Sequence, residues 1–213
     1  MVDHTLLKPE ATQGQIDALC AEAEVLQTRT VCVNGLWVRA AAEQLESSTV
    51  DVCAVVGFPL GAMHLGSLLS ETTDAIEGGA AEIDMVIPVG FVKGGAWTRA
   101  RAYISAVRSA MPGDGGLKVI LEAALLSDAE LVDACKVSVD AGAQFVKTST
   151  GFNAAGGATV HAVRLMRATV GPEVGVKAAG GIRTLSDALA MLDAGANRLG
   201  MSATRAVASE LGR

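Results

Sequence analysis

The sequence predicts a (β/α)8 barrel, the TIM-barrel form of the α/β class, and three observations favour it. Short apolar runs rich in β-branched residues recur along the whole chain, and segments with helical periodicity separate them. A similar acid-x-Gly-Ala segment precedes several of these runs. No linker and no change in composition divides residues 1–213. We therefore expect a single domain in which strands and helices alternate to close one barrel, rather than an open doubly wound sheet.

Eight runs have the length and composition of strands buried in a parallel sheet. The first of them is the weakest, because three of its five residues are charged or polar. The predicted strands are Val2–Leu6, Thr30–Val33, Asp51–Val56, Glu82–Ile87, Leu117–Leu121, Gln144–Thr148, Val174–Lys177 and Arg198–Met201.

The segment after the fourth predicted strand shows the helical pattern clearly. Its apolar residues are three or four positions apart, at Trp97, Ala100, Ile104, Val107 and Met111, and so form one face of a helix. Polar residues occupy positions one step round from these. This pattern predicts a helix with one face on the core and the other in solvent.

Helix boundaries are marked by capping and glycine signals. Ser127 with Glu130, and Thr184 with Asp187, have the spacing of a capping box just before apolar helical segments. Glycine after a helix provides the left-handed backbone that a turn back into the sheet requires. Three equivalent junctions of this kind are expected at Glu77–Ala80, Asp140–Ala143 and Asp193–Ala196.

The charge composition argues against nucleic-acid binding. The 17 basic and 23 acidic residues give a formal net charge of -6, and no run of lysine or arginine is present. An anionic ligand must therefore be held by a local site. The 24 glycines and few aromatic residues suit a barrel with small interior side chains and many tight turns.

No disulfide framework or zinc site is predicted, because no two cysteines form a C-x-x-C pair. The cysteines are Cys20, Cys32, Cys53 and Cys135. A reducing cytoplasm is therefore the expected compartment. Residues 1–10 lack the apolar core of a signal peptide. Glycine and proline interrupt the uncharged stretch 52–70, so we expect no membrane span there.

Three charged residues lie inside predicted strands, where burial without a partner or a function would be costly. Lys147 and Lys177 lie at or near the C-terminal ends of neighbouring strands, and Asp84 lies in the fourth strand. Barrel active sites form at the C-terminal ends of the strands. These residues are therefore candidates for catalysis, although a single lysine at a strand end often only extends to solvent.

Two inward lysines on neighbouring strands would change each other's chemistry. Strands about 4.8 Å apart bring the ammonium groups to within about 6 Å. At an effective dielectric near 20 such charges repel by about 2.8 kcal/mol. This repulsion and partial burial lower the pKa of one amine, so Lys147 can act as a Schiff-base nucleophile. Asp84 is the expected proton carrier, a role compatible with its being a buried partner of one lysine.

Glycine-rich turns follow the last two predicted strands, at Ala178–Thr184 and Gly200–Ser202. In barrels this pair of loops commonly binds phosphate, with backbone N–H groups and a helix N-terminus facing the anion. A Gly-Gly turn alone is more often only a turn. Its place after the seventh strand is what indicates a phosphate site.

Five blocks of the sequence resemble the deoxyribose-phosphate aldolase family, in order and over essentially the whole chain. The two blocks that contain the lysines are the most specific. The blocks are Asp3–Lys8, Gly57–Gly61, Glu82–Val86, Phe145–Phe152 and Gly175–Thr184.

The resemblance implies an enzyme without metal or cofactor that reversibly cleaves 2-deoxy-D-ribose 5-phosphate to acetaldehyde and D-glyceraldehyde 3-phosphate. Lys147 would form the Schiff base, Lys177 would lower its pKa, and Asp84 would transfer protons. Small phosphorylated sugars and aldehydes would be its partners, in a homodimer or homotetramer. The remaining positions that match the substrate site are Gly180, Gly181, Gly200, Ser202, Arg183, Thr148, Gly151, Asp3, Thr5 and Cys32.

Some positions depart from the family pattern or have a simpler explanation. Ala203 stands where many relatives have a second serine, and only two residues precede Asp3 where many relatives have a short helix. The single tyrosine, Tyr103, lies in mid-chain, so it cannot serve as the C-terminal tyrosine of some relatives. Cys32 is explained equally well as a small core residue.

Two alternative functions remain open at the sequence level. One is a Schiff-base aldolase or transaldolase for another phosphorylated sugar. The other is a non-catalytic barrel that binds sugar phosphates or serves as an assembly subunit. The combination of Lys147, Lys177 and Asp84 argues against the second, because a pure binding protein has no need of an activated amine.

Overall fold

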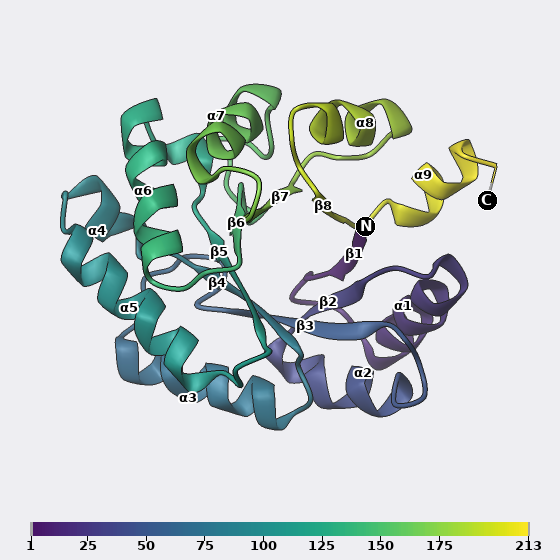
Figure 1. The fold of residues 1–213 in the computed structure, drawn as a ribbon. Coiled ribbons are helices and arrows are strands. Elements are labelled where there is room, and N and C mark those ends of the chain that lie inside the picture. The colour runs from purple at the N-terminus through teal and green to yellow at the C-terminus, as the bar shows by residue number, and fades with distance from the viewer. Residues whose placement is uncertain (1, 213) are drawn as a thin grey trace.

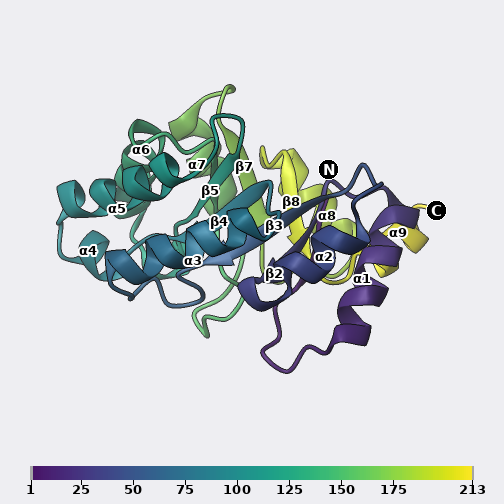
Figure 2. The ribbon, with the colours of Figure 1, turned by 90° about the horizontal axis from the view of Figure 1, so that it is seen from below.

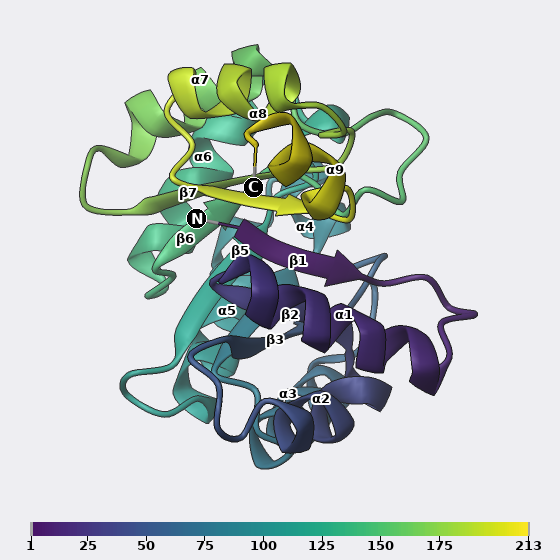
Figure 3. The same ribbon diagram turned by 90° about the vertical axis from the view of Figure 1, so that its right-hand side faces the viewer.

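The computed structural model describes residues 2–212, which form a closed barrel of parallel strands in the order β1 to β8 (Figure 1). The purple β1 lies beside the yellow β8 and closes the barrel (Figure 3). This confirms the predicted fold class. The strands are β1 (Val2–Leu6), β2 (Thr30–Asn34), β3 (Asp51–Val56), β4 (Glu82–Val86), β5 (Gly116–Ile120), β6 (Phe145–Lys147), β7 (Gly175–Ala179) and β8 (Arg198–Met201).

The helices lie outside the strands as an outer layer (Figures 1 and 2). None of the helices within residues 2–212 is long and apolar enough to cross a membrane. The helices are α1 (Gln13–Leu26), α2 (Val38–Gln44), α3 (Leu65–Glu77), α4 (Val89–Lys93), α5 (Trp97–Ala110), α6 (Asp128–Asp140), α7 (Val160–Val170), α8 (Leu185–Asp193) and α9 (Thr204–Glu210), with 3-10 turns η1 (Gly35–Trp37) and η2 (Ala123–Leu125).

One predicted strand end is wrong in a way that matters for the site. The seventh strand was expected to end at Lys177, but β7 continues to Ala179, so Lys177 lies in its middle. Ala178 and Ala179 lack β-branching, and their strand conformation comes from pairing with Leu199 and Gly200 of β8. Lys147 is the last residue of β6, which ends one residue before the predicted end at Thr148. The two lysines are also direct partners in the register of β6 and β7.

The predicted helix signals are confirmed. Both capping boxes form, at Ser127 before α6 and at Thr184 before α8. The three junction glycines Gly79, Gly142 and Gly195 have φ values of 104°, 96° and 110°. Only glycine adopts this backbone without strain, so each can turn the chain from a helix into the next strand.

Alternation along the strands separates an apolar exterior from a charged interior. In β4, Ile83 and Met85 belong to the core between the barrel and its helices, whereas Glu82 and Asp84 contact charged residues of other strands. Successive side chains of a strand point to opposite faces, so one run of residues serves both surfaces. The inside of this barrel is therefore where the sequence places its buried charges.

We expect Ile104→Ala to lower the free energy of unfolding by about 2 to 5 kcal/mol, because it removes a buried side chain and leaves a cavity. Ile104 is fully buried on the inner face of α5. Thr98→Ala, on the exposed face of the same helix, should change the free energy of unfolding by about 0.5 kcal/mol or less. Urea unfolding followed by circular dichroism measures both, and equal effects would contradict this assignment of faces.

Candidate active site

Asp84 is a buried carboxylate shared by three lysines. Its Oδ1 atom lies 2.8 Å from Lys118 Nζ, and its Oδ2 atom lies 2.7 Å from both Lys147 Nζ and Lys177 Nζ. The four residues come from β4, β5, β6 and β7, so neighbouring strands supply the whole group. Because both lysine nitrogens bind one oxygen, Lys147 and Lys177 lie within reach of each other, as the sequence predicted.

A second layer of charge lies next to this group. Asp3 Oδ2 lies 2.5 Å from Lys177 Nζ, and Asp3 Oδ1 lies 2.6 Å from Arg198 Nη1. Glu82 Oε2 lies 2.6 Å from Lys118 Nζ and 3.2 Å from the same arginine nitrogen. These contacts link β1, β4, β5, β7 and β8 across the interior of the barrel.

This network contains one more cation than carboxylate. Its cations are Lys118, Lys147, Lys177 and Arg198, and its carboxylates are Asp3, Glu82 and Asp84. Loss of one proton therefore leaves it electrically balanced. Among its lysines, Lys147 is the one whose side chain retains some exposure and the one that lines a cavity. It can release a proton with the least disturbance of the buried contacts.

The pKa values of the buried groups follow from these contacts. Burial alone would raise the pKa of Asp84, but Lys118, Lys147 and Lys177 together hold it well below its usual value. Burial would lower the pKa of Lys177, but Asp3 and Asp84 outweigh burial and raise it. Lys177 is thus held as an ammonium ion. The like-charge repulsion considered from sequence alone is partly offset by the carboxylate between the two lysines.

A cavity of about 380 Å³ opens above this network. It contains eight of the predicted site residues, including Lys147, and adds Lys8 and Phe152. Phe152 packs edge-on against Phe58, with ring centroids 5.2 Å apart. The lining residues are Thr5, Leu6, Leu7, Lys8, Lys147, Thr150, Gly151, Phe152, Ala179, Gly180, Gly181, Arg183, Gly200 and Ser202.

The other predicted residues lie below or beside the cavity wall. Asp84, Lys177 and Asp3 form the charged floor described above, and Cys32 is fully buried near them. Thr148 is not on the wall: its hydroxyl donates to the carbonyl of Ala179 and accepts from the N–H of the same residue. It therefore joins β6 to β7 rather than facing the cavity.

The glycine turn after β7 has the geometry of an anion site, but the helix behind it does not contribute as expected. Gly180 and Gly181 have φ values of 86° and 84°, and within residues 2–212 their N–H groups have no protein acceptor. By contrast, the N–H groups of Arg183 and Thr184 both donate to Asp187 Oδ2. The capping box thus occupies N–H groups at the start of α8, and the turn itself is left to bind an anion.

Close approach explains why glycine occurs at position 200. A Cβ atom there would lie 2.9 Å from Lys177 Cε and 3.2 Å from Ala179 Cβ. Both distances are shorter than ordinary carbon contacts. Because Gly200 has no side chain, the side chain of Lys177 can pack beside β8.

Sequence reasoning missed Lys118, Glu82, Arg198 and Glu122. Lys118 lies in an apolar run, which is the signal that identified Asp84, so the same criterion could have found it. Glu122 has a left-handed backbone with φ 54°, and its carboxylate accepts from both the hydroxyl and the N–H of Thr150. It holds the loop after β6 against the cavity, and no local sequence pattern marks that contact.

The fold is that of a (β/α)8 barrel, and the floor of its cavity places the Lys147 amine in contact with the buried Asp84 carboxylate. A family model described as DeoC/LacD family aldolase matches residues 1–210. The chain belongs to this family.

Curated relatives are similar over nearly their whole length. A deoxyribose-phosphate aldolase from Brevibacillus brevis is 56% identical over 201 residues, which cover 94% of this chain and 90% of the relative. One from Corynebacterium diphtheriae is 52% identical over 212 residues, which cover 100% of this chain and 95% of the relative.

Solved structures agree with the fold. A structure described as a putative deoxyribose-phosphate aldolase from Coccidioides immitis superposes with a TM-score of 0.96 at 42% identity, covering 100% of this chain and 84% of that one. The deoxyribose phosphate aldolase of Aeropyrum pernix, described as a tetramer, superposes with a TM-score of 0.89 at 32% identity, covering 99% and 89%.

We expect Lys118→Met to destabilise the protein by about 3 to 5 kcal/mol, because it leaves Glu82 and Asp84 buried with one cation fewer. Lys136→Met is the matched control, since its ion pair with Asp133 is exposed and 3.9 Å long. The free energy of unfolding of that variant should fall by about 0.5 kcal/mol or less. Chemical denaturation of both proteins gives the comparison, and a Lys118→Met protein as stable as the control would contradict the network.

Proposed function

We propose that this chain reversibly cleaves 2-deoxy-D-ribose 5-phosphate to acetaldehyde and D-glyceraldehyde 3-phosphate through a Schiff base on Lys147. The observation that carries the proposal is that Lys147 Nζ and Lys177 Nζ both contact Asp84 Oδ2 at 2.7 Å, while only Lys147 of the two lines the cavity. The names of the curated relatives support the choice of substrate.

The first step requires a neutral amine. Lys147 can pass its proton to Asp84, with which it is in contact, while Lys177 remains charged between two carboxylates. Asp84 then releases the proton to solvent in the cavity, so that it is again a carboxylate and the charge of the buried network is balanced. Lys147 then attacks C1 of the open-chain aldehyde, and loss of water from the carbinolamine forms a protonated imine.

Cleavage of the C2–C3 bond follows because the imine accepts its electrons. The C3 hydroxyl must lose a proton, which Asp84 receives through Lys177 or an ordered water; the contact between Asp84 and Lys177 supports this route. The resulting enamine is protonated at C2, and hydrolysis releases acetaldehyde and frees Lys147. D-Glyceraldehyde 3-phosphate leaves as the other product.

The phosphate end of the substrate is assigned to the part of the cavity that the turns after β7 and β8 line. Gly180, Gly181 and Gly200 offer backbone there, and Ser202 and Arg183 offer polar side chains. Lys8 adds a further cation on the same cavity. The volume of about 380 Å³ falls within the usual range for sites that bind small ligands.

The alternative substrate is another phosphorylated sugar cleaved by the same Schiff-base chemistry. The family description covers more than one aldolase, so family membership alone does not select the aldehyde. Assay of a panel of aldehyde acceptors separates the two. A non-catalytic binding role is disfavoured, because such a protein has no use for a lysine amine that lines the cavity while it contacts a buried carboxylate.

Assembly and compartment remain proposals of the same kind. A homodimer or homotetramer is supported by a relative at 32% identity whose structure is described as a tetramer. A cytoplasmic location and a single domain are supported by the scattered cysteines and the unbroken alternation of strand and helix.

Borohydride reduction in the presence of 2-deoxy-D-ribose 5-phosphate should attach the sugar to Lys147 and to no other lysine, because only an imine is reduced to a stable amine at that position. Peptide mapping by mass spectrometry locates the added mass. In Lys147→Ala the label should vanish while circular dichroism stays native. Unchanged labelling of Lys147→Ala would overturn the assignment of the nucleophile.

Replacement of Lys177 by leucine should shift the rate profile to higher pH. The substitution removes a like charge that shares the Asp84 oxygen with Lys147, so a neutral amine forms less readily and the rate at neutral pH falls. The pH dependence of kcat/KM measures the shift. Lys136→Leu, on the surface of α6, should leave it unchanged, and an unaltered profile in Lys177→Leu would contradict the coupling of the two lysines.

A further inference from the structure

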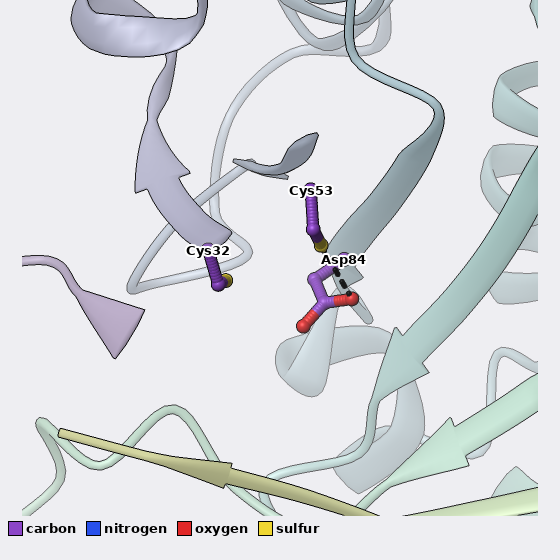
Figure 4. A group of neighbouring side chains, drawn as sticks. All are labelled: Cys32, Cys53 and Asp84. Atoms are coloured by element: carbon purple, nitrogen blue, oxygen red, sulfur yellow. Dashed lines mark hydrogen bonds between the residues drawn. The ribbon is translucent and has the colours of Figure 1, made fainter. Parts of the chain in front are cut away.

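Cys32 and Cys53 form a buried pair beside the catalytic carboxylate. They are direct partners in the register of β2 and β3, and both are fully buried. Figure 4 shows both side chains directed toward Asp84 from neighbouring strands. The two sulfur atoms and one carboxylate oxygen of Asp84 lie within 4.8 Å of one another. Cys53 Sγ lies 3.2 Å from Asp84 Oδ1.

The surrounding charges make this group a poor site for a metal ion. Both carboxylate oxygens of Asp84 are already in contact with ammonium groups at 2.7 to 2.8 Å. Lys118 Nζ also lies 3.3 Å from Cys53 Sγ. A divalent cation between the sulfur atoms would have to displace these lysines and would face their positive charge.

The two thiols meet the requirements of a disulfide. Neighbouring strands place paired Cα atoms about 4.8 Å apart, inside the range that disulfides span. Their sulfur atoms are no more than 4.8 Å apart, and rotation about χ1 can bring them to bonding distance. The other cysteines, Cys20 in α1 and Cys135 in α6, lie on outer helices.

A small oxidant has a short path to the pair. Cys32 and Cys53 pack in a small apolar cluster with Leu7 and Val55, and Leu7 also lines the active-site cavity. Leu7 therefore connects the cluster that contains the thiols to the cavity. The Cys32 thiol has a lowered pKa, chiefly through its contact with Cys53 and also through the charges of Lys177 and Lys147.

We propose that Cys32 and Cys53 are an oxidation site that reacts with hydroperoxides to form a disulfide inside the barrel. The Cys32 thiolate attacks one oxygen of the peroxide, the O–O bond breaks, and a sulfenic acid forms as the other oxygen leaves and is protonated to water or alcohol. Cys53 then attacks that sulfur, the S–O bond breaks, and the departing hydroxide takes the proton of Cys53 as water. Two thiols are oxidised and one peroxide is reduced.

The disulfide stops the reaction of the nearby lysines. Its formation draws Cys53 Sγ away from Asp84 Oδ1 and Lys118 Nζ, which are its partners in the reduced protein. The position of Asp84 determines the contact that activates Lys147. This inhibitory effect rests on the proposed aldolase function, whereas formation of the cross-link does not.

Treatment of the folded enzyme with hydrogen peroxide, alkylation and non-reducing peptide mapping tests the proposal. The peptides of Cys32 and Cys53 should appear joined, lighter by the mass of two hydrogen atoms, and dithiothreitol should restore both free thiols and activity. Cys20→Ala and Cys135→Ala should form the same cross-link. In Cys53→Ala the joined peptide should be absent, and Cys32 should react with dimedone, which labels sulfenic acids.

Two outcomes would overturn the proposal. One is four free thiols after exposure to peroxide that oxidises free cysteine under the same conditions. The other is a cross-linked enzyme with full activity, which removes the inhibitory effect. Borohydride trapping on the reduced enzyme is run in parallel and tests the aldolase assignment separately. If that assignment fails, the mass of the peptides still shows whether the disulfide has formed.

Discussion

Burial of the Asp84 carboxylate among three ammonium groups is the interaction on which the rest of the site depends. A carboxylate or ammonium ion alone in such an interior would be neutralised, because the loss of hydration is larger than any single contact returns. Here Lys118, Lys147 and Lys177 reach Asp84 from three successive strands. The closed barrel supplies the geometry, since only its interior brings all these strand faces together.

The same strands serve two purposes because their side chains alternate. Outward residues such as Ile83 and Met85 pack against the helices and stabilise the barrel, while inward Glu82 and Asp84 take part in the charged network. Residues of the apolar core and residues of the charged network therefore alternate along the strand.

Positive charge lies beside both the proposed nucleophile and the proposed oxidation site. Lys147 and Lys177 share one oxygen of Asp84. The contact of Cys32 with Cys53, and then the charges of these two lysines, lower the pKa of the Cys32 thiol. The turn at Gly180 and Gly181 lies apart from this network, on the cavity wall, where its N–H groups can meet an anion without disturbing the buried charges.

The sequence by itself determined the barrel, the helix caps, and the importance of Lys147, Lys177 and Asp84, because periodicity, capping and charge inside apolar runs are local properties. Only the tertiary structure decided that Lys118 completes the group around Asp84. It also decided that Asp187 occupies N–H groups at the start of α8, and that the Thr148 hydroxyl bonds to Ala179 and does not line the cavity. These facts depend on register between strands distant in sequence. No local pattern records which side chains a closed barrel brings into contact.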